Sequence, residues 1–222
     1  MFLDYTDEQR ALRKELREYF AELLTPELRA ELGAAGEGSA AFRTVVRRIG
    51  ADGWLGIGWP KEYGGQGRDA FDQFIFFDEV QRAAAPFPFV TINTVGPTLM
   101  TYGTEEQKQQ FLPPLCSGEH IGCFGLSEPE AGSDAGNCQT RAVLDGDHFV
   151  VNGAKMWITN AAHARTMVTT VKTDPEAPRS RGISALIIDL ESPGIEIPKP
   201  EDKLGLRGSN TNQVFLKEVR VA

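Results

Sequence analysis

The chain reads TRAVLDGDHFVVNGAKMWITN from Thr140 to Asn160, and this stretch decides the fold of the C-terminal half. Short β-favouring runs lie on either side of Asp145-Gly146-Asp147, and Asp-Gly and Asn-Gly pairs are strong hairpin signals. We therefore predict a hairpin at this Asp-Gly pair. A second turn is predicted at Asn152-Gly153, which would lead the chain into a strand over Ala154–Ile158.

The two-residue period continues through the rest of this half. Further strands are predicted over Thr166–Val171, Ile183–Leu190 and Val214–Val219, and the segment Lys172–Arg181, rich in proline and charge, is predicted to be a solvated hairpin loop. Residues 119–222 are thus expected to form an antiparallel β domain, built as a barrel or a sandwich.

The first half has a helical period instead. Thr6 and Gln9 fit a capping box, which predicts a helix that ends before Pro26 and buries Leu12, Leu16, Phe20 and Leu23. After Ser39 a second helix is predicted to bury Phe42, Val45, Val46 and Ile49 and to end at Gly50.

Glycine and proline divide the remainder of this half. The stretch 53–67 contains too many glycines for regular structure and is predicted to be a long packed turn. Helices are then expected from Asp69, from Val90 to Tyr102, and from Thr104 through Phe111 before Pro113-Pro114. The helix from Asp69 is expected to have an apolar set of Phe71, Phe74, Ile75, Phe77 and Val80. The predicted class is α+β, with an all-helical domain over residues 1–118 followed by the β domain.

Composition narrows the function classes. Among the 222 residues 41% are hydrophobic, the formal net charge is −8, and the pI is near 5.0. No segment has the clustered Lys and Arg that nucleic-acid binding needs, and no apolar run approaches the roughly 20 residues of a membrane span. The first residues lack the features of a secretory signal, which favours a cytoplasmic location.

The cysteines and histidines indicate no metal centre. Cys116, Cys123 and Cys138 lack C-x-x-C spacing, and the three histidines form no ligand cluster with them. We predict no metal and no disulfide framework, but three reduced thiols that fill space.

Two motifs place groups that suit a flat redox cofactor. FGLSEPEAGSD at Phe124–Asp134 combines hydroxyls with a glycine that permits close backbone approach, and NGAKMWITN at Asn152–Asn160 contributes an indole and a hydroxyl. Because Trp157 and Thr159 are two residues apart on a predicted strand, both are expected on one side of it. A flavin needs an aromatic or apolar wall, and its diphosphate needs hydroxyls and backbone N–H groups.

Together with other segments in the same order, these motifs resemble the acyl-CoA dehydrogenase family, including bacterial forms that act on steroid side chains. The further segments are Trp59-Pro60, Tyr63-Gly64-Gly65, Tyr102–Lys108, Leu204–Ser209 and Val219-Arg220-Val221. Two departures are mild: Ser127 stands where many relatives have Thr, and Glu130 where many have Gly.

The resemblance implies FAD as cofactor and the α,β-dehydrogenation of an acyl-CoA thioester to a trans-2-enoyl-CoA. It makes Phe124, Leu126 and Ser127 flavin contacts, places Trp157 against the isoalloxazine, and puts Thr159 near N5. Ser133 would lie near the phosphates of the cofactor or the thioester carrier. Asn93, Thr94 and Val95 are candidate wall residues of the acyl pocket. The family also suggests a role in fatty acid and lipid metabolism.

The resemblance also implies what this chain would not contain. Most relatives take the catalytic base from a C-terminal helical domain, and Glu62, Glu79 and Glu128 match no family base, so no catalytic residue is expected here. We expect a fragment that holds FAD weakly, oxidises no acyl-CoA alone, and aggregates through an apolar face. Delivery of electrons to an electron-transfer flavoprotein and a homo- or hetero-tetramer are implied for the complete enzyme.

Two alternatives stay open. Some relatives assemble from two different chains, one of which lacks the base, so the chain could be a non-catalytic partner subunit. An acyl-CoA oxidase or a flavin monooxygenase of the same architecture would keep the fold and change the chemistry.

Overall fold

The computed structural model describes residues 4–206 and 208–222. The first three residues, and Arg207 of the Leu204–Ser209 motif, lie outside the described residues. The chain forms two compact units, each with its own core. The first runs through Ile92 and resumes over Gly96–Glu119, and the second comprises Asn93–Val95 and His120–Ala222.

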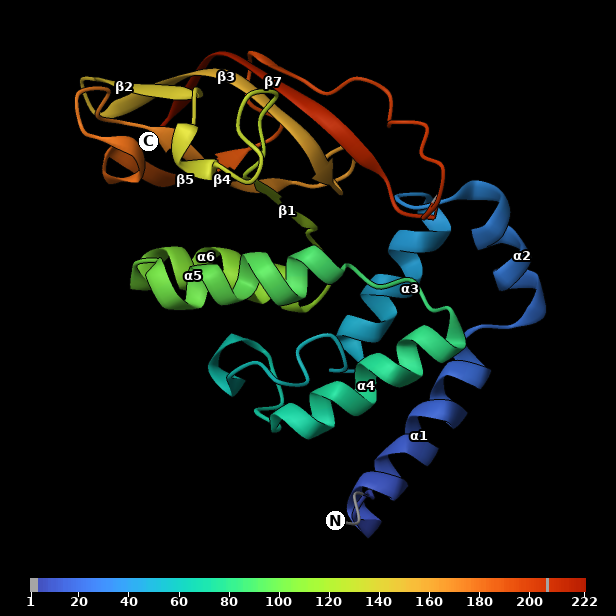
Figure 1. Ribbon diagram of the computed structural model, residues 1–222. Coiled ribbons are helices and arrows are strands. Elements are labelled where there is room, and N and C mark those ends of the chain that lie inside the picture. The colour runs from blue at the N-terminus through green and yellow to red at the C-terminus, as the bar shows by residue number, and fades with distance from the viewer. Residues whose placement is uncertain (1–3, 207) are drawn as a thin grey trace. The chain divides into compact units, whose positions relative to one another are not determined.

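The first unit is helical (Figure 1). Its elements are α1 (Asp7–Leu23), α2 (Pro26–Ala35), α3 (Ala40–Ala51), the short helix η1 (Lys61–Tyr63), α4 (Ala70–Ala83), α5 (Gly96–Tyr102) and α6 (Glu105–Cys116). A π-helical turn, η2 (Thr91–Val95), precedes α5. The predicted caps are confirmed, since Thr6, Ser39, Asp69 and Thr104 each accept a hydrogen bond from the first turn of their helix.

The core of this unit confirms much of the predicted pattern. Leu12, Leu16 and Phe20 of α1 are buried, as are the four predicted apolar residues of α3. The glycine-rich stretch forms a packed turn, because Trp54, Leu55, Ile57 and Trp59 are buried although none lies in an α-helix.

Three helical predictions were wrong, and one helix was missed. Leu24 is buried in place of Leu23, because the chain leaves the helix there and turns its next side chain inward. The first helix ends before Pro26, as predicted, but α2 was missed; Pro26 is its first residue, where the missing N–H costs nothing. In α4, Phe71 and Phe74 are 66% and 57% exposed, and the inward residues are Ile75, Phe76, Glu79 and Val80.

The third wrong prediction concerns the end of α6. The helix continues through Pro113 and Pro114 to Cys116. Both prolines lie in its last turns, and the carbonyls left without a helical donor belong to Gln109 and Gln110, which are exposed to water. The prolines therefore do not stop the helix where the sequence predicted.

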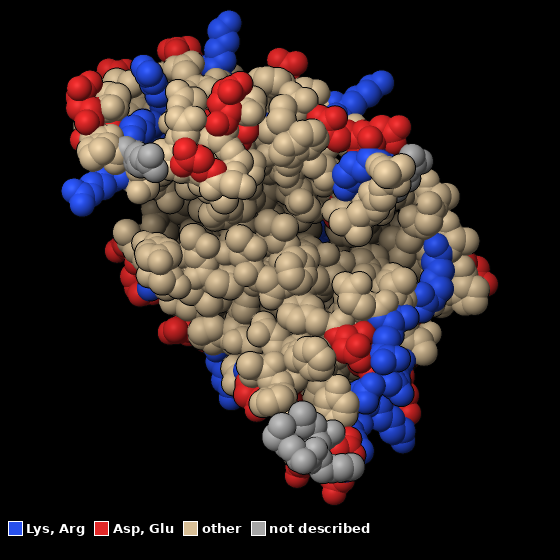
Figure 2. All heavy atoms as spheres, in the orientation of Figure 1, with Lys and Arg blue, Asp and Glu red and all other residues tan. Residues whose placement is uncertain are grey.

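A buried carboxylate joins α1 to α4. Glu79 is 2% exposed and binds Arg13 at 3.2 Å and Arg17 at 2.9 Å, while Asp78 binds Arg82 at 2.9 Å. In Figure 2, Lys and Arg side chains follow one margin of the helical unit beside a wide uncharged surface. Several arginines of α1 are thus paired with acids.

The second unit is one curled sheet of β1 (Gly122–Gly125), β2 (Arg141–Asp145), β3 (His148–Thr159), β4 (Thr166–Lys172), β5 (Ile183–Asp189), β6 (Ile195–Glu196) and β7 (Thr211–Val221). Short helices η3 (Ala135–Asn137) and η4 (Arg179–Gly182) lie in its connections. The order is β1-β4-β2-β3-β7-β6, with β5 on the other edge of β4. The predicted strands after residue 160 and the Lys172–Arg181 hairpin loop are confirmed.

The sheet is mixed, so the prediction of an antiparallel barrel or sandwich needs correction. β1 and β2 both pair in parallel with β4, and the β2–β3 hairpin lies between β1 and β4 in the chain. A long connection of this kind brings strands together in the same direction. The helical-then-β organisation itself is confirmed.

The predicted turn at Asn152-Gly153 was also wrong. β3 runs through both residues and shows a register shift against β7 between Val151 and Gly153. The extra residue of this irregularity lies in β7, because Val151 to Gly153 opposes Val219 to Leu216. A Cβ at Gly153 would lie 2.5 Å from Thr140 Oγ1, so glycine serves the close approach of β3 to Thr140. The hairpin around Gly146 is confirmed by the pairing of Asp145 with His148.

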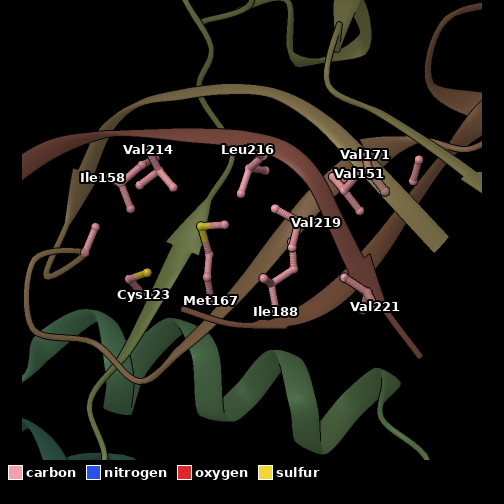
Figure 3. Packing of buried hydrophobic residues seen from close by; sticks show 12 residues of the cluster. Cys123, Val151, Ile158, Met167, Val171, Ile188, Val214, Leu216, Val219 and Val221 are labelled. Atoms are coloured by element: carbon pink, nitrogen blue, oxygen red, sulfur yellow. The ribbon is translucent and has the colours of Figure 1, made fainter. Parts of the chain in front are cut away.

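Apolar side chains from the two sides of the curled sheet meet inside it (Figure 3). Cys123 of β1, Met167 of β4 and Ile188 of β5 face Val214 and Leu216 of β7, and all are buried. Burial of side chains of this size stabilises a fold by about 1.5–3 kcal/mol each. This core fixes the ends of β1 and β3, which carry the candidate site.

Candidate functional site

The two sequence motifs meet in space. Leu126 and Ser127 follow directly after β1, and Met156 N–H in β3 donates a 2.9 Å hydrogen bond to the carbonyl oxygen of Ser127. The structure therefore brings Ser127 next to the strand that carries Trp157 and Thr159.

Trp157 has a backbone conformation that bulky residues rarely adopt. Its φ is 62°, and β3 shifts register against β7 between Lys155 and Ile158. A conformation of this kind costs about 1–3 kcal/mol and persists only where the surrounding structure enforces it. The irregularity leaves Lys155 and Ile158 both buried and the Trp157 side chain 58% exposed.

The bulge bears on the prediction that Trp157 and Thr159 lie on one side of the strand, which assumed regular alternation of side chains. Lys155 and Trp157 are two residues apart, yet one is buried and the other exposed, so simple alternation fails at this point. After the bulge the order is exposed Trp157, buried Ile158 and half-buried Thr159, and the shared side of the indole and the hydroxyl stays a prediction.

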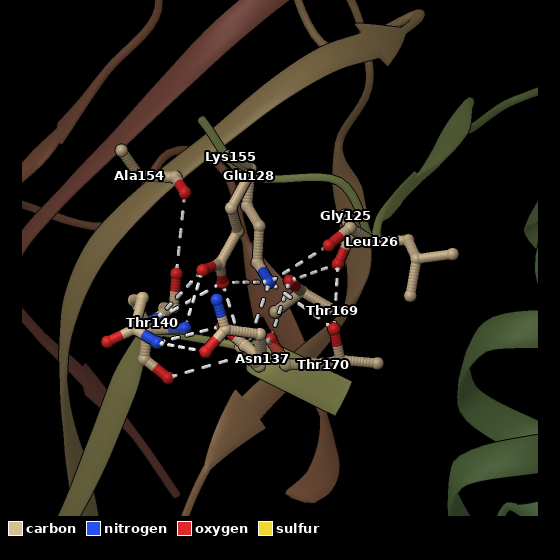
Figure 4. A network of polar contacts seen from close by, with 11 residues as sticks. Gly125, Leu126, Glu128, Asn137, Thr140, Ala154, Lys155, Thr169 and Thr170 are labelled. Atoms are coloured by element: carbon tan, nitrogen blue, oxygen red, sulfur yellow. Dashed lines mark hydrogen bonds and ion pairs between the residues drawn. The ribbon is translucent and has the colours of Figure 1, made fainter. Parts of the chain in front are cut away.

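A buried ion pair lies beneath the two motifs (Figure 4). Lys155 Nζ is 2.7 Å from Glu128 Oε1, and the two residues are 1% and 4% exposed. The carboxylate also accepts hydrogen bonds from the backbone N–H of Gln139 at 2.6 Å and of Thr140 at 3.1 Å, and from the thiol of Cys138. The ammonium donates to Thr170 Oγ1 at 3.3 Å.

These contacts set the charge of Glu128. Burial acts to raise the pKa of this carboxyl, but hydrogen bonds from Lys155, Thr140, Gln139 and Cys138 outweigh it and lower the pKa to about 2. Glu128 is therefore an ionised structural group at neutral pH. Glu128 is not assigned as the catalytic base from the sequence, and its burial is consistent with that.

The end of β1 is held by close packing. Thr169 Oγ1 donates a 2.7 Å hydrogen bond to the carbonyl oxygen of Gly125. A Cβ at Gly125 would lie 2.5 Å from Thr169 Oγ1, so only glycine fits. Leu126 and Ser127 thus leave the sheet from a fixed point.

The exposed groups around this junction suit a flat aromatic ligand. Trp157 and the 41% exposed Leu126 offer apolar surface. Within the described part of the chain, the hydroxyls of Ser127 and Thr159 make no hydrogen bond. Apolar wall and unused hydroxyls are what an isoalloxazine and a diphosphate require, so these residues fit a flavin.

Other predicted site residues lie in different surroundings. Phe124 is half-buried within β1, and Ser133 is exposed in the bend before η3. Asn93 and Thr94 are half-buried in the π-helical turn, whereas Val95 is completely buried. By their contacts these three residues group with the β unit, and their place in an acyl pocket stays a prediction.

A polar hollow begins one residue after Ser133. It has a volume of about 410 Å³ and is lined by Asp134, Asn137, Gln139, Arg141 and Lys172, among others. Two cationic side chains at a polar hollow can attract a phosphate.

The cysteines are buried and free, as predicted. Burial raises the pKa of the Cys116 thiol to about 11 and raises that of Cys123 further. Over residues 4–206 and 208–222, no group of three or more His, Cys, Asp or Glu could hold a metal ion. No helix in those ranges has the length and apolarity to cross a membrane.

Sequence reasoning missed Lys155, Thr140 and Thr170 as parts of the site's support. A lysine between apolar residues is the only sequence signal for the buried pair. Its partner, Glu128, is 27 residues away, and only the fold brings them together.

Comparisons with known proteins agree with the motifs. Residues 6–119 match the model of the acyl-CoA dehydrogenase N-terminal domain, and residues 123–219 match that of the middle domain. The chain is 46% identical to acyl-CoA dehydrogenase FadE26 of Mycobacterium tuberculosis, over 100% of this chain and 56% of that protein.

Two solved structures are similar over the whole chain. The ChsE4-ChsE5 complex from Mycobacterium tuberculosis gives a TM-score of 0.91 at 47% identity, covering 100% of this chain and 56% of the matched one. The Tcur3481-Tcur3483 steroid acyl-CoA dehydrogenase gives 0.90 at 47% identity, covering 100% and 57%. The chain thus spans a little over half the length of these relatives, and by its two domain matches it belongs to the acyl-CoA dehydrogenase family.

Proposed function

We propose that this chain supplies the flavin-contacting part of an FAD-dependent acyl-CoA dehydrogenase. The observation that carries the proposal is the junction of Ser127 with β3, where an exposed indole is held in a strained bulge beside unused hydroxyls. A costly backbone conformation that exposes an aromatic ring is explained by a ligand that covers the ring. We assign the helical part to residues 1–118 and the flavin-contacting part to 119–222.

The residues of this chain would orient the cofactor. Trp157 would pack its indole against the ring system, and Leu126 and Phe124 would supply further apolar contact. The Thr159 hydroxyl would donate a hydrogen bond near the atom that receives hydride, and the Ser127 hydroxyl would donate one at the ring edge. When bound, FAD supplies the two-electron acceptor for oxidation of the Cα–Cβ bond of an acyl-CoA thioester.

Substrate binding is supported by the polar hollow and by Ser133. Arg141 and Lys172 would place positive charge near a phosphate of the carrier, and the Ser133 hydroxyl lies next to that hollow in sequence. Asn93, Thr94 and Val95 would line part of the acyl pocket. The general base is assigned to no residue of this chain, and an electron-transfer flavoprotein, a tetramer and a cytoplasmic location are proposed for the complete enzyme.

A second candidate is a non-catalytic subunit of a two-chain dehydrogenase. It is favoured by the 47% identity to a chain of the ChsE4-ChsE5 complex, which contains two different proteins. In such an assembly the partner would contribute the base, while this chain would keep or lose the flavin contacts.

A titration with FAD tests the proposal. Flavin fluorescence anisotropy is followed as the purified chain is added, with Trp157→Ala and the control Val143→Ala, which removes an exposed apolar side chain from β2. We expect weak binding by the unaltered chain and the control, and an affinity about tenfold lower for Trp157→Ala, equivalent to about 1.4 kcal/mol. Equal binding by all three proteins would contradict the assignment of Trp157.

A further inference from the structure

We propose that Glu128 and Lys155 are positioning residues, and that their buried ion pair is what presents Trp157 to the cofactor. The inference rests on the proposed flavin site. It adds a role for two side chains that would not touch the flavin themselves.

The ion pair and a backbone hydrogen bond form a double link between the two motifs. Glu128 directly follows Ser127, and Lys155 directly precedes Met156. The pair joins these side chains at 2.7 Å, and the Met156 N–H joins the Ser127 carbonyl at 2.9 Å. The turn after β1 and the bulge of β3 are therefore held at adjacent points on both chains.

The link is anchored to two further strands. Glu128 accepts the N–H groups of Gln139 and Thr140, which lead into β2. Lys155 donates to Thr170 in β4, and also to the carbonyl oxygen of Leu126 at 3.4 Å. A buried charged pair satisfied on every side has little freedom to shift.

The direction of Lys155 explains the direction of Trp157. In a regular strand, side chains two apart point the same way, so an inward Lys155 would carry Trp157 inward as well. Ile158 must also face the core, where it is 2% exposed. Lys155 and Ile158 are three residues apart, so both can face the core only if the strand is irregular between them. The register shift and the positive φ of Trp157 are that irregularity.

The pair therefore does more than stabilise the sheet. It fixes one side of the bulge, while the pairing of Ile158 with Asn212 of β7 fixes the other. Without the inward ammonium, residues 155–157 can return to alternation, which would withdraw the indole from the surface.

The test replaces the pair by a neutral one of similar shape, Glu128→Gln with Lys155→Met. Glutamine keeps an acceptor for the N–H groups of Gln139 and Thr140, and methionine fills the space of the lysine stem. Proteins often tolerate the replacement of both partners of a buried ion pair, so this double variant is expected to fold. Lys155→Met alone would instead leave the buried Glu128 carboxylate unpaired. The stability control is Val219→Ala, which weakens the β core away from the pair.

Hydrogen exchange followed by NMR on the whole chain gives a readout that needs no flavin. We expect the Met156 amide of the double variant to exchange at least about tenfold faster, while amides at the far end of β3, such as Val151, keep their protection. In the control, the amides of β3 are expected to lose protection together. The FAD affinity of the double variant should fall about as far as that of Trp157→Ala, although the double variant melts near the unaltered chain.

Two results would overturn the positioning role. One is unchanged Met156 protection in the double variant, and the other is a uniform loss like that of Val219→Ala. If the unaltered chain binds no FAD, the proposed function fails, but the exchange comparison still decides whether the pair holds the bulge.

Discussion

Trp157 is the single residue on which the proposed flavin site depends most. The residue is 58% exposed, its φ is 62°, and Lys155 and Ile158 on the two sides of the bulge are buried. An exposed aromatic side chain contributes little to the core, so its strained backbone must be maintained by its neighbours. Function explains the residue better than stability does.

Truncation of Trp157 should separate backbone strain from burial. Trp157→Asn and Trp157→Val both remove the ring, but asparagine tolerates a positive φ and a β-branched residue does not. We expect the valine variant to be less stable by about 1–2 kcal/mol, although valine is the better strand former. Urea denaturation of both variants measures the difference, and a more stable valine variant would show that the bulge is not strained.

Glu128 predicts a pH dependence. Its pKa is near 2 in the folded protein and 4.5 when unperturbed, so the unfolded chain binds the proton first as pH falls. The ionised carboxylate therefore contributes stability that is present above pH 4.5 and lost toward pH 2, about 3 kcal/mol in all.

The double variant Glu128→Gln, Lys155→Met should lack this contribution. Between pH 6 and pH 3, the free energy of unfolding is expected to fall about 2 kcal/mol further in the unaltered chain than in the variant. Equilibrium denaturation at both pH values gives the comparison. Parallel losses in the two proteins would show that Glu128 titrates normally in the fold.

At the scale of elements, the end of β1 depends on one close approach. Gly125→Ala would place a methyl group 2.5 Å from Thr169 Oγ1, and overpacking of this kind costs about 1–3 kcal/mol. Gly132→Ala in the same motif meets nothing within 4 Å and serves as the matched control. Denaturant midpoints should fall for the first variant and stay within about 0.5 kcal/mol for the second; a similar change in both would refute the packing argument.

The elements also show what the sequence could and could not predict. Caps and apolar periods identified α1, α3 and α4, because these signals are local. The period failed for α2, which has no buried residue, and turn chemistry failed at Asn152-Gly153, where pairing with β7 keeps the strand continuous.

The candidate site was predictable only in part. Trp157, Thr159 and Ser127 could be named from their motifs, because the chemistry of those side chains is local. The parallel pairing of β1 with β4 and the partnership of Lys155 with Glu128 arise from contacts distant in sequence. No periodicity encodes them.

For the whole molecule, exposed apolar surface on the helical unit is the main feature outside the site. Phe71 and Phe74 line a hollow together with Ala70, Tyr5, Gln9 and Asp4. Exposed apolar patches promote association. We expect the chain to self-associate as its concentration rises, and the double variant Phe71→Ser, Phe74→Ser to self-associate less. Sedimentation velocity measures both proteins. Equal association of the two would show that another surface mediates it.

The central claim is that the turn after β1 and the bulge of β3 hold a flavin ring between them. A crystal structure of the protein with FAD tests it most directly. We predict that the isoalloxazine lies against the Trp157 indole, with the Thr159 hydroxyl within hydrogen-bond distance of the ring. Ring density remote from both side chains would contradict it.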